Sequence, residues 1–287
     1  MEEHNILKTG EGTFPIHEDV ALLLTTSGTT GSPKLVKLSY QNLQSGMEYA
    51  RECLNIQSKQ KSMAILPLNY VYGLSVYLWH WYCGATVLIT EYPIISEQFN
   101  EFFKREKVNS LATVPFTYQL LNKICFWDKE KLECLNWAMA GGAQLTEADQ
   151  KAIVSIMKEK FWIGYGQTET FSLVCGTNFD EKNLKIGTIG KPVKDVTMLI
   201  DDITGELIVK SKSICMGYAY NKEQLLESDQ NNGVWHTGDL AIIDEEGYVF
   251  LKGRLTRDIK ILGKRINMDE IERYLSNKIL DNKFACV

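Results

Sequence analysis

A hydroxyl-rich loop near the start of the chain contains the residue types that bind phosphate. The loop is Thr25-Thr26-Ser27-Gly28-Thr29-Thr30-Gly31-Ser32-Pro33-Lys34. Glycines let a backbone approach an anion closely, hydroxyl groups donate hydrogen bonds, and the lysine adds a positive charge. It is not a Walker A loop, because Pro33 precedes Lys34 and a strand-like segment follows. An ordinary Ser/Thr/Gly hairpin is the alternative interpretation of this loop taken alone.

The elements around this loop alternate between apolar strands and amphipathic helices. Ser96 and Thr146 have the residue types of helix N-caps, and Pro115 suits a first helical turn. The alternation predicts an α/β fold with mostly parallel sheets flanked by helices. The expected strands are 21–26, 34–38, 62–66, 85–90, 111–114, 136–140 and 161–165, and the expected helices are 42–54, 77–82, 96–106 and 146–160.

The pattern changes after about residue 185. Short strand-like segments at 196–200, 206–210, 241–243 and 248–251 are separated by turn-forming residues such as Thr204-Gly205 and Glu246-Gly247. We expect a small β-rich unit at about 185–255. Residues 258–287 begin with a strand and a turn, followed by a helix-like segment at 268–280, which predicts the start of a small α+β C-terminal domain.

Composition places the chain among soluble globular proteins and argues against several classes of partner. The formal charge is 31 − 36 = −5, with 45% hydrophobic residues, and this acidic balance disfavours sequence-independent nucleic-acid binding. The most apolar stretch, 74–89, includes His80, so we expect no membrane span. The seven cysteines form no C-x-x-C pair, which indicates a cytoplasmic chain without a disulfide framework or zinc site.

The loop and a series of later motifs resemble the adenylate-forming enzyme superfamily, which includes acyl-CoA synthetases, peptide-synthetase adenylation domains and luciferases. The motifs follow the family's order over nearly the whole chain. They are the 25–34 loop, Leu66-Pro67-Leu68-Asn69-Tyr70-Val71-Tyr72-Gly73-Leu74, Gly141-Gly142-Ala143, Tyr165-Gly166-Gln167-Thr168-Glu169, 187–192, Gly205-Glu206-Leu207, His236-Thr237-Gly238-Asp239, 253–256, 258–260, 263–267 and 270–272.

The resemblance implies a role for each matched residue. The enzymes of this family join a carboxylate to the α-phosphate of ATP and expel pyrophosphate, and a thiol of CoA or phosphopantetheine usually attacks the acyl-adenylate next. Glu169 is expected to hold Mg²⁺, Thr168 to touch the α-phosphate, Tyr165 to stack on adenine, and Asp239 with Arg254 to bind the ribose. Other nucleotide-binding positions are Thr26, Ser27, Gly28, Thr29, Thr30, Gly31, Lys34, Gly141, Gly142, Ala143 and Gly166. The remaining expectations are Lys260 in the thioester step, Thr256 at the inter-domain hinge, and Tyr70, Tyr72 and Gly73 at the acid pocket.

The pocket motif indicates the class of acid. Peptide-synthetase domains that activate α-amino acids usually place an aspartate near this motif, but 69–72 contains no acidic residue. An uncharged acyl or aryl acid is therefore the favoured substrate. Trp79 and Trp81 are candidates for the pocket lining, although ordinary core packing is the favoured interpretation for both.

The resemblance also predicts that the chain is truncated at both ends relative to the family. We expect 1–255 to form part of a large nucleotide- and acid-binding domain, and 256–287 to form the hinge and the beginning of the C-terminal domain. No residue matches the lysine that the family uses for adenylation. Three hypotheses stay open: an ATP-dependent acid–thiol ligase whose acceptor is CoA or an acyl carrier protein, a nucleotide-binding fragment or half-enzyme that needs a complementary chain or only binds ATP or acyl-AMP, and an unrelated α/β domain.

Overall fold

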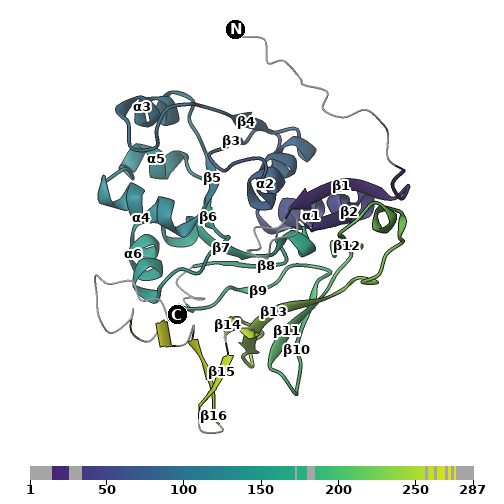
Figure 1. The fold of residues 1–287 in the computed structure, drawn as a ribbon. Coiled ribbons are helices and arrows are strands. Elements are labelled where there is room, and N and C mark those ends of the chain that lie inside the picture. The colour runs from purple at the N-terminus through teal and green to yellow at the C-terminus, as the bar shows by residue number, and fades with distance from the viewer. Residues whose placement is uncertain are drawn as a thin grey trace.

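The computed structural model describes residues 15–25, 34–171, 173–179 and 185–255, and, toward the C-terminus, 258–261, 264–268, 271–272 and 275. Three layers dominate Figure 1: a central sheet with helices α3 to α6 on one face and helices α1 and α2 on the other. Smaller antiparallel sheets lie beside it. The alternation of strands and helices predicted this arrangement, so the expected α/β class is confirmed.

The central sheet has seven strands in the order β4-β3-β5-β6-β7-β8-β9. Strands β4, β3, β5, β6 and β7 run parallel, whereas β8 and β9 are antiparallel additions. Parallel strands must be joined by crossovers, which explains why the helices alternate with them in sequence. The bounds are β3 (Lys61–Met63), β4 (Thr86–Leu88), β5 (Ser110–Thr113), β6 (Trp137–Ala140), β7 (Phe161–Tyr165), β8 (Cys175–Asn178) and β9 (Lys191–Pro192).

Side-chain caps define where several helices begin. The Ser96 and Thr146 hydroxyl groups accept hydrogen bonds from the third residue of their helices, and Pro115 occupies the first turn of α4. All three capping predictions are confirmed. The helices are α1 (Tyr40–Cys53), α2 (Val71–Tyr82), α3 (Glu97–Arg105), α4 (Pro115–Lys123), α5 (Lys129–Cys134) and α6 (Glu147–Met157), with 3-10 turns η1 (Lys158–Lys160), η2 (Thr168–Thr170) and η3 (Glu223–Leu226).

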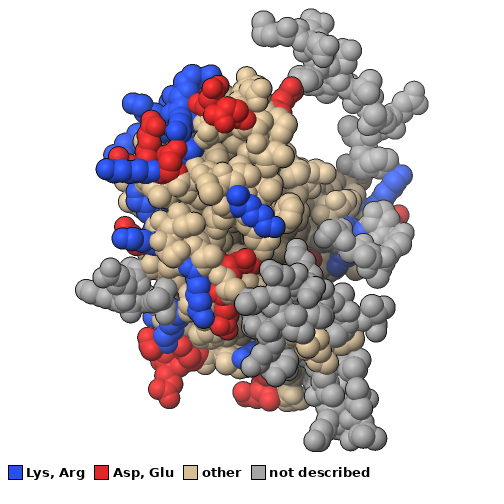
Figure 2. Space-filling view, turned by 90° about the vertical axis from the view of Figure 1, so that its left-hand side faces the viewer, with Lys and Arg blue, Asp and Glu red and all other residues tan. Residues whose placement is uncertain are grey.

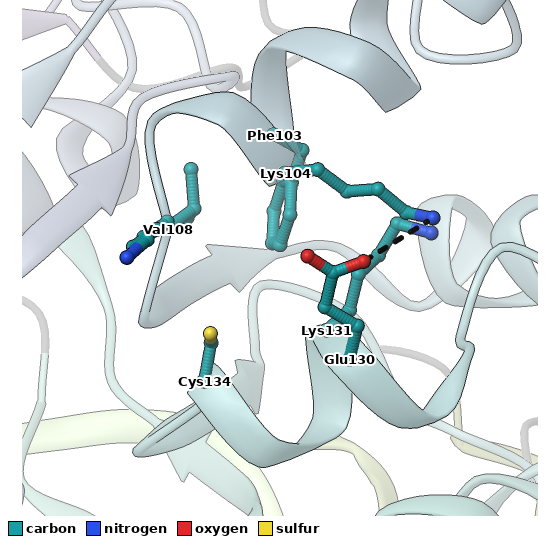
Figure 3. A pocket seen from close by; sticks show the side chains of 7 residues that line it. Phe103, Lys104, Val108, Glu130, Lys131 and Cys134 are labelled. Carbon is teal, nitrogen blue, oxygen red and sulfur yellow. Dashed lines mark ion pairs between the residues drawn. The ribbon is translucent and has the colours of Figure 1, made fainter.

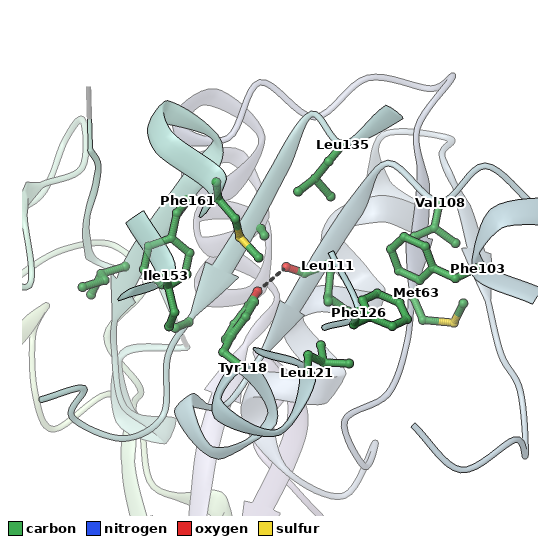
Figure 4. Packing of buried hydrophobic residues seen from close by; sticks show 14 of the residues in the cluster. Met63, Phe103, Val108, Leu111, Tyr118, Leu121, Phe126, Leu135, Ile153 and Phe161 are labelled. Atoms are coloured by element: carbon green, nitrogen blue, oxygen red, sulfur yellow. Dashed lines mark hydrogen bonds between the residues drawn. The ribbon is translucent and has the colours of Figure 1, made fainter. Parts of the chain in front are cut away.

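Successive side chains along the strands point to opposite faces of the central sheet, and hydrophobic residues pack on both faces. Ala138 and Ala140 of β6 pack in the cluster beneath α3, α4 and α6, whereas Trp137 and Met139 pack against α1 and α2. Figure 4 shows the first cluster, where the Tyr118 hydroxyl donates to the Leu111 carbonyl oxygen at 3.1 Å. Hydrophobic clusters on both faces thus pack against β5, β6 and β7, and these strands end at the candidate site.

Antiparallel sheets make up the rest of the described chain. A four-stranded sheet has the order β10-β11-β13-β14, a three-stranded sheet has the order β1-β2-β12, and β15 pairs with β16. Their bounds are β1 (Val20–Thr25), β2 (Leu35–Ser39), β10 (Thr197–Ile200), β11 (Glu206–Lys210), β12 (Gly217–Ala219), β13 (Val234–Ile243), β14 (Val249–Arg254), β15 (Asp258–Ile261) and β16 (Lys264–Asn267). The β-rich unit expected at 185–255 is therefore present, and its β12 reaches back to the N-terminal hairpin.

Helix α2 and strand β13 extend furthest beyond their predicted bounds. Helix α2 begins at Val71 and not near Tyr77, because the pocket motif itself forms its first turns. Strand β13 begins at Val234, although only 241–243 was expected to be a strand. Gly238, with a φ of 70°, lies inside β13 at a register shift that hid the strand pattern.

The surface over the α3–α6 layer carries charges of both signs. Figure 2 shows basic and acidic side chains interspersed on this face. Lys104 pairs with Asp128 at 2.8 Å, and Lys129 pairs with Glu133 at 3.7 Å. In the described part of the chain, none of the helices combines the length and apolar character that a bilayer-spanning segment requires.

Candidate nucleotide site

The matched motifs meet where the parallel strands of the central sheet end. Gly141 and Gly142 follow β6, and Gly166 follows β7 before the turn η2. Ligands of open α/β sheets bind in the crevice outside the carboxyl ends of the strands. This edge of the sheet also faces strands β13 and β14, so residues far apart in sequence come together there.

Asp239 is the centre of a polar cluster at this edge. Its Oδ2 accepts hydrogen bonds from the Tyr165 hydroxyl at 2.6 Å and from Gln167 Nε2 at 2.8 Å. Its Oδ1 lies 3.0 Å from Arg254 Nε. The Asp239 residue is only 8% exposed, and donors from several elements offset the cost of burying its charge. Burial and the neighbouring Asp239 carboxylate raise the pKa of Tyr165 well above its usual range.

The backbone around Thr237-Gly238-Asp239 is fixed by polar contacts. The Thr237 hydroxyl donates to the Leu207 carbonyl oxygen at 2.7 Å and accepts from the Asp239 backbone N–H at 3.1 Å. The Gly238 backbone N–H donates to Glu206 Oε1 at 2.7 Å. Gly238 adopts a positive φ that side chains disfavour. In the β13–β14 register Asp239 lies opposite Arg254, which explains their ion pair.

Glu169 belongs to a second cluster that includes Lys34, the last residue of the predicted phosphate-binding loop. The Tyr218 hydroxyl donates to Glu169 Oε1 at 2.6 Å, and Lys34 Nζ lies 4.0 Å from the centroid of the Tyr218 ring. Burial and the hydrogen bond to Glu169 raise the pKa of Tyr218 above its ordinary value. Tyr218 thus contacts the lysine ammonium group with the face of its ring and the Glu169 carboxylate with its hydroxyl.

The glycine turn after β6 is closely packed against the pocket tyrosines. A Cβ added at Gly141 would lie 3.1 Å from the Gly164 carbonyl oxygen and 3.2 Å from the Tyr72 ring. A Cβ at Gly142, whose φ is 77°, would lie 3.1 Å from the Tyr70 hydroxyl oxygen. The buried Tyr72 donates its own hydroxyl to the Met139 carbonyl oxygen at 3.2 Å. Close packing against Gly164 and the two tyrosines therefore favours glycine at both positions.

The donor set suits a magnesium triphosphate better than a metal held by protein alone. Among the described residues there is no group of three or more His, Cys, Asp or Glu side chains that could hold a metal ion. Mg²⁺ in nucleotide sites usually takes one or two carboxylates and completes its shell with phosphate oxygens and water. Glu169 offers one such carboxylate, and Lys34 offers a compensating charge for the phosphates.

The structure brings together most, but not all, of the predicted residues. Thr168 opens η2 beside Glu169, and Ala143 is exposed next to the glycine turn. Gly73 is buried, and a Cβ there would collide with the Pro67 carbonyl oxygen. Close packing therefore explains why this position is a glycine. Lys260 lies in β15 opposite Arg265. Thr26, Ser27, Gly28, Thr29, Thr30, Gly31 and Thr256 lie outside the described residues.

The two tryptophans considered for the acid pocket have different environments. Trp79 is fully buried in the core beneath α2, as the packing interpretation expected. Trp81 is 65% exposed and therefore fits neither the pocket nor the core.

A small recess between α3 and α5 lies apart from these clusters. Figure 3 shows the Phe103, Val108 and Cys134 side chains with the Lys104–Glu130 ion pair, whose atoms are 3.7 Å apart, at its rim. None of the predicted site residues lines it. The recess is a packing feature of the helical layer.

Three contributors to the site were not predicted: Gln167, Tyr218 and Trp235. Trp235 Nε1 donates to Gln167 Oε1 at 2.9 Å, and the Trp235 ring packs edge-on against Tyr218 with centroids 5.8 Å apart. A contiguous series of contacts therefore joins Lys34 to Asp239 through these residues. Each depends on long-range strand pairing, for which a single sequence carries no local signal.

Comparison with known proteins agrees with this geometry. Residues 6–219 match the family model described as AMP-binding enzyme. The chain is 30% identical over 277 residues to luciferin 4-monooxygenase from Luciola mingrelica, covering 90% of this chain and 49% of that protein. It is 26% identical over 271 residues to 2-succinylbenzoate–CoA ligase from Enterococcus faecalis, and the match covers 90% of this chain and 54% of that protein.

The fold also resembles that of a solved structure. The o-succinylbenzoate CoA synthetase from Bacillus subtilis, in complex with its acyl-adenylate intermediate, superposes with a TM-score of 0.79 at 25% identity. The match covers 91% of this chain and 55% of that one. The chain thus spans about half the length of the curated relatives that it matches. Because the family model covers well over half of its residues, the chain belongs to the family of AMP-binding enzymes.

Proposed function

We propose that this protein takes part in ATP-dependent activation of a carboxylic acid to an acyl-adenylate, followed by transfer to the thiol of CoA or of a carrier protein's phosphopantetheine. The observation that carries the proposal is the convergence of two clusters at one edge of the sheet. Asp239, Tyr165 and Arg254 form the first, and Glu169 with Lys34 forms the second. Such a site suits a nucleoside at one end and its phosphates at the other.

In this reaction an acid carboxylate oxygen bonds to the α-phosphorus of ATP, and the bond from that phosphorus to the pyrophosphate oxygen breaks. Such chemistry depends on orientation and charge neutralisation more than on a protein nucleophile. Asp239 accepts hydrogen bonds from the ribose hydroxyls, and Arg254 pairs with its carboxylate and orients it. The Tyr165 ring stacks on adenine while its hydroxyl stays on Asp239.

The phosphate end uses the second cluster. Lys34 neutralises the leaving pyrophosphate together with the loop at 26–31, and Thr168 donates to the α-phosphate. Glu169 would hold Mg²⁺, which supplies further charge neutralisation when bound. Tyr218 keeps Glu169 and Lys34 in place by its hydroxyl and its ring.

The acid lies beside the glycine turn in this proposal. The Tyr72 ring and a methyl group of Val114 present an apolar wall there. A Cβ atom built on Gly142 would lie 3.7 Å from that methyl group. The Tyr70 hydroxyl at Gly142 is a neutral polar group. These side chains favour an uncharged acyl or aryl acid over an α-amino acid, whose ammonium group needs a carboxylate partner. In the thioester step the thiol sulfur bonds to the acyl carbon and AMP leaves; as the family resemblance implies, we assign Lys260 of β15 to this step and Thr256 to the inter-domain hinge.

Pyrophosphate exchange with a panel of aliphatic, aryl and α-amino acids tests the proposal. The full chain, Mg²⁺, ATP and labelled pyrophosphate are incubated with each acid, and label in ATP is measured. Acid-dependent exchange supports adenylation, and its dependence on the acid reports the substrate class. ATP binding without exchange with any acid would support the alternative of a nucleotide-binding chain that needs a complementary polypeptide for turnover. Absence of both would contradict the proposal.

A further inference from the structure

Gln167 occupies the position of the Tyr-Gly-x-Thr-Glu motif to which the resemblance assigns no role. Its side chain nevertheless makes three close polar contacts across the site. Oε1 accepts from Trp235 Nε1 at 2.9 Å, and Nε2 donates to the Thr237 carbonyl oxygen at 2.9 Å and to Asp239 Oδ2 at 2.8 Å. The contacts join the β7–η2 connection to strand β13.

The chemistry of the partners leaves one orientation for the amide. An indole N–H only donates and an ionised carboxylate only accepts, so Oε1 must face Trp235 and Nε2 must face Asp239. The backbone of Gln167 is held as well, because its N–H donates to Thr170 Oγ1 at 2.9 Å. Both amide hydrogens then have acceptors within the protein, at Thr237 and Asp239. Gln167 therefore acts on a bound nucleotide through Asp239 and not by direct contact.

We propose that Gln167 is a positioning residue that orients the Asp239 carboxylate and thereby sets how strongly the site distinguishes nucleotides that carry ribose hydroxyls from those that lack them. The inference rests on the proposed function, in which Asp239 accepts from those hydroxyls. The Tyr165 hydroxyl reaches the same Asp239 oxygen at 2.6 Å. That bond alone leaves the carboxylate free to pivot about its Oδ2–Tyr165 contact, whereas the amide and Arg254 define its plane.

Two substitutions separate the polarity of the amide from its volume. Gln167→Met keeps an unbranched side chain of similar length and removes both donor and acceptor. Gln167→Glu keeps the shape but places a carboxylate against Asp239 and the Thr237 carbonyl oxygen, where like charges repel. A role in packing alone predicts that Met keeps the preference for nucleotides with ribose hydroxyls, whereas the positioning role predicts that Met loses it.

Gln119→Met is a matched control. Gln119 Nε2 donates to Asp149 Oδ2 at 2.6 Å, so the substitution removes the same kind of amide–carboxylate contact. The pair joins α4 to α6, in the helical layer beneath the sheet. Its loss tests whether a general decrease in stability alters nucleotide recognition.

The experiment measures the dissociation constants of ATP and 2′,3′-dideoxy-ATP with Mg²⁺ by calorimetry on the full chain and its variants. Hydrogen bonds to a carboxylate contribute about 1.5–3 kcal/mol, so wild type should prefer ATP by roughly tenfold or more. We expect the ratio to fall to about threefold or less in Gln167→Met, with weaker ATP binding still in Gln167→Glu, and to be unchanged in Gln119→Met.

The outcomes distinguish this inference from the proposed function. A Gln167→Met variant that keeps the wild-type ratio, or loses affinity for both nucleotides equally, would overturn the positioning role alone. So would a Gln167→Glu variant that binds ATP as well as wild type does. A wild-type chain that binds neither nucleotide would overturn the proposed function, and this inference with it.

Discussion

Replacing Asp239 with asparagine should separate recognition of the nucleoside from recognition of the phosphates. Asparagine has the same shape but offers one acceptor oxygen and one donor group. If its oxygen takes the place of Oδ2, the bonds from Tyr165 and Gln167 persist, and the amide group faces the Arg254 guanidinium. The lost ion pair involves an Arg254 side chain that is 53% exposed, so solvent screening limits the loss of folding stability to about 1 kcal/mol.

The loss in ATP affinity should be larger than the loss in stability. Hydrogen bonds to an ionised carboxylate are roughly twice as strong as bonds to a neutral oxygen. For two ribose hydroxyls the difference is about 2 kcal/mol, or about 30-fold in dissociation constant. Inorganic pyrophosphate, which lacks the nucleoside, should bind Asp239→Asn within about twofold of wild type. Calorimetry with both ligands provides the test, and equal losses for ATP and pyrophosphate would refute the ribose assignment.

Three further variants test other parts of the structure. Tyr218→Phe removes the 2.6 Å hydrogen bond to Glu169 and should weaken binding of Mg²⁺–ATP by roughly tenfold, with little effect on ATP measured in EDTA. Gly141→Ala places a methyl group 3.1 Å from a carbonyl oxygen of β7 and should lower the free energy of unfolding in urea by about 1–3 kcal/mol. Burial raises the pKa of Cys53 and Cys215 from 9.0 to about 12, so unfolding releases protons above pH 9 and the free energy of unfolding falls between pH 9 and 12. A double alanine variant at these two cysteines should show a shallower decline, and an unchanged slope would contradict the burial argument.

The layered fold could be predicted because its strands and helices follow local patterns. Caps at Ser96 and Thr146 and the proline at 115 mark helix starts that the structure confirms. The start of α2 was less predictable, since 66–74 resembles a pocket loop yet supplies the first turns of a helix. The length of β13 was hidden by Gly238, whose positive φ interrupts the strand pattern without ending the strand.

The candidate site was predictable only where a motif carries its own chemistry. Asp239 and Glu169 could be selected from sequence; in the structure Tyr165 and Gln167 donate hydrogen bonds to Asp239, and Tyr218 donates one to Glu169. Tyr218 could not, because it reaches Glu169 through the pairing of β12 with β2 across a long stretch of chain. Gln167 looks interchangeable in sequence, and its role depends on Trp235 in the opposing sheet.

The most direct test of the account is a titration of the full chain with ATP, with and without Mg²⁺, for wild type and Glu169→Gln. If the two clusters form one magnesium–nucleotide site, wild type binds ATP saturably and more tightly when Mg²⁺ is present. The neutral amide should remove most of that Mg²⁺-dependent gain, roughly tenfold in affinity or more, while the variant still folds. A wild-type chain with no saturable ATP binding, or a Glu169→Gln variant that keeps the full effect of Mg²⁺, would contradict the account.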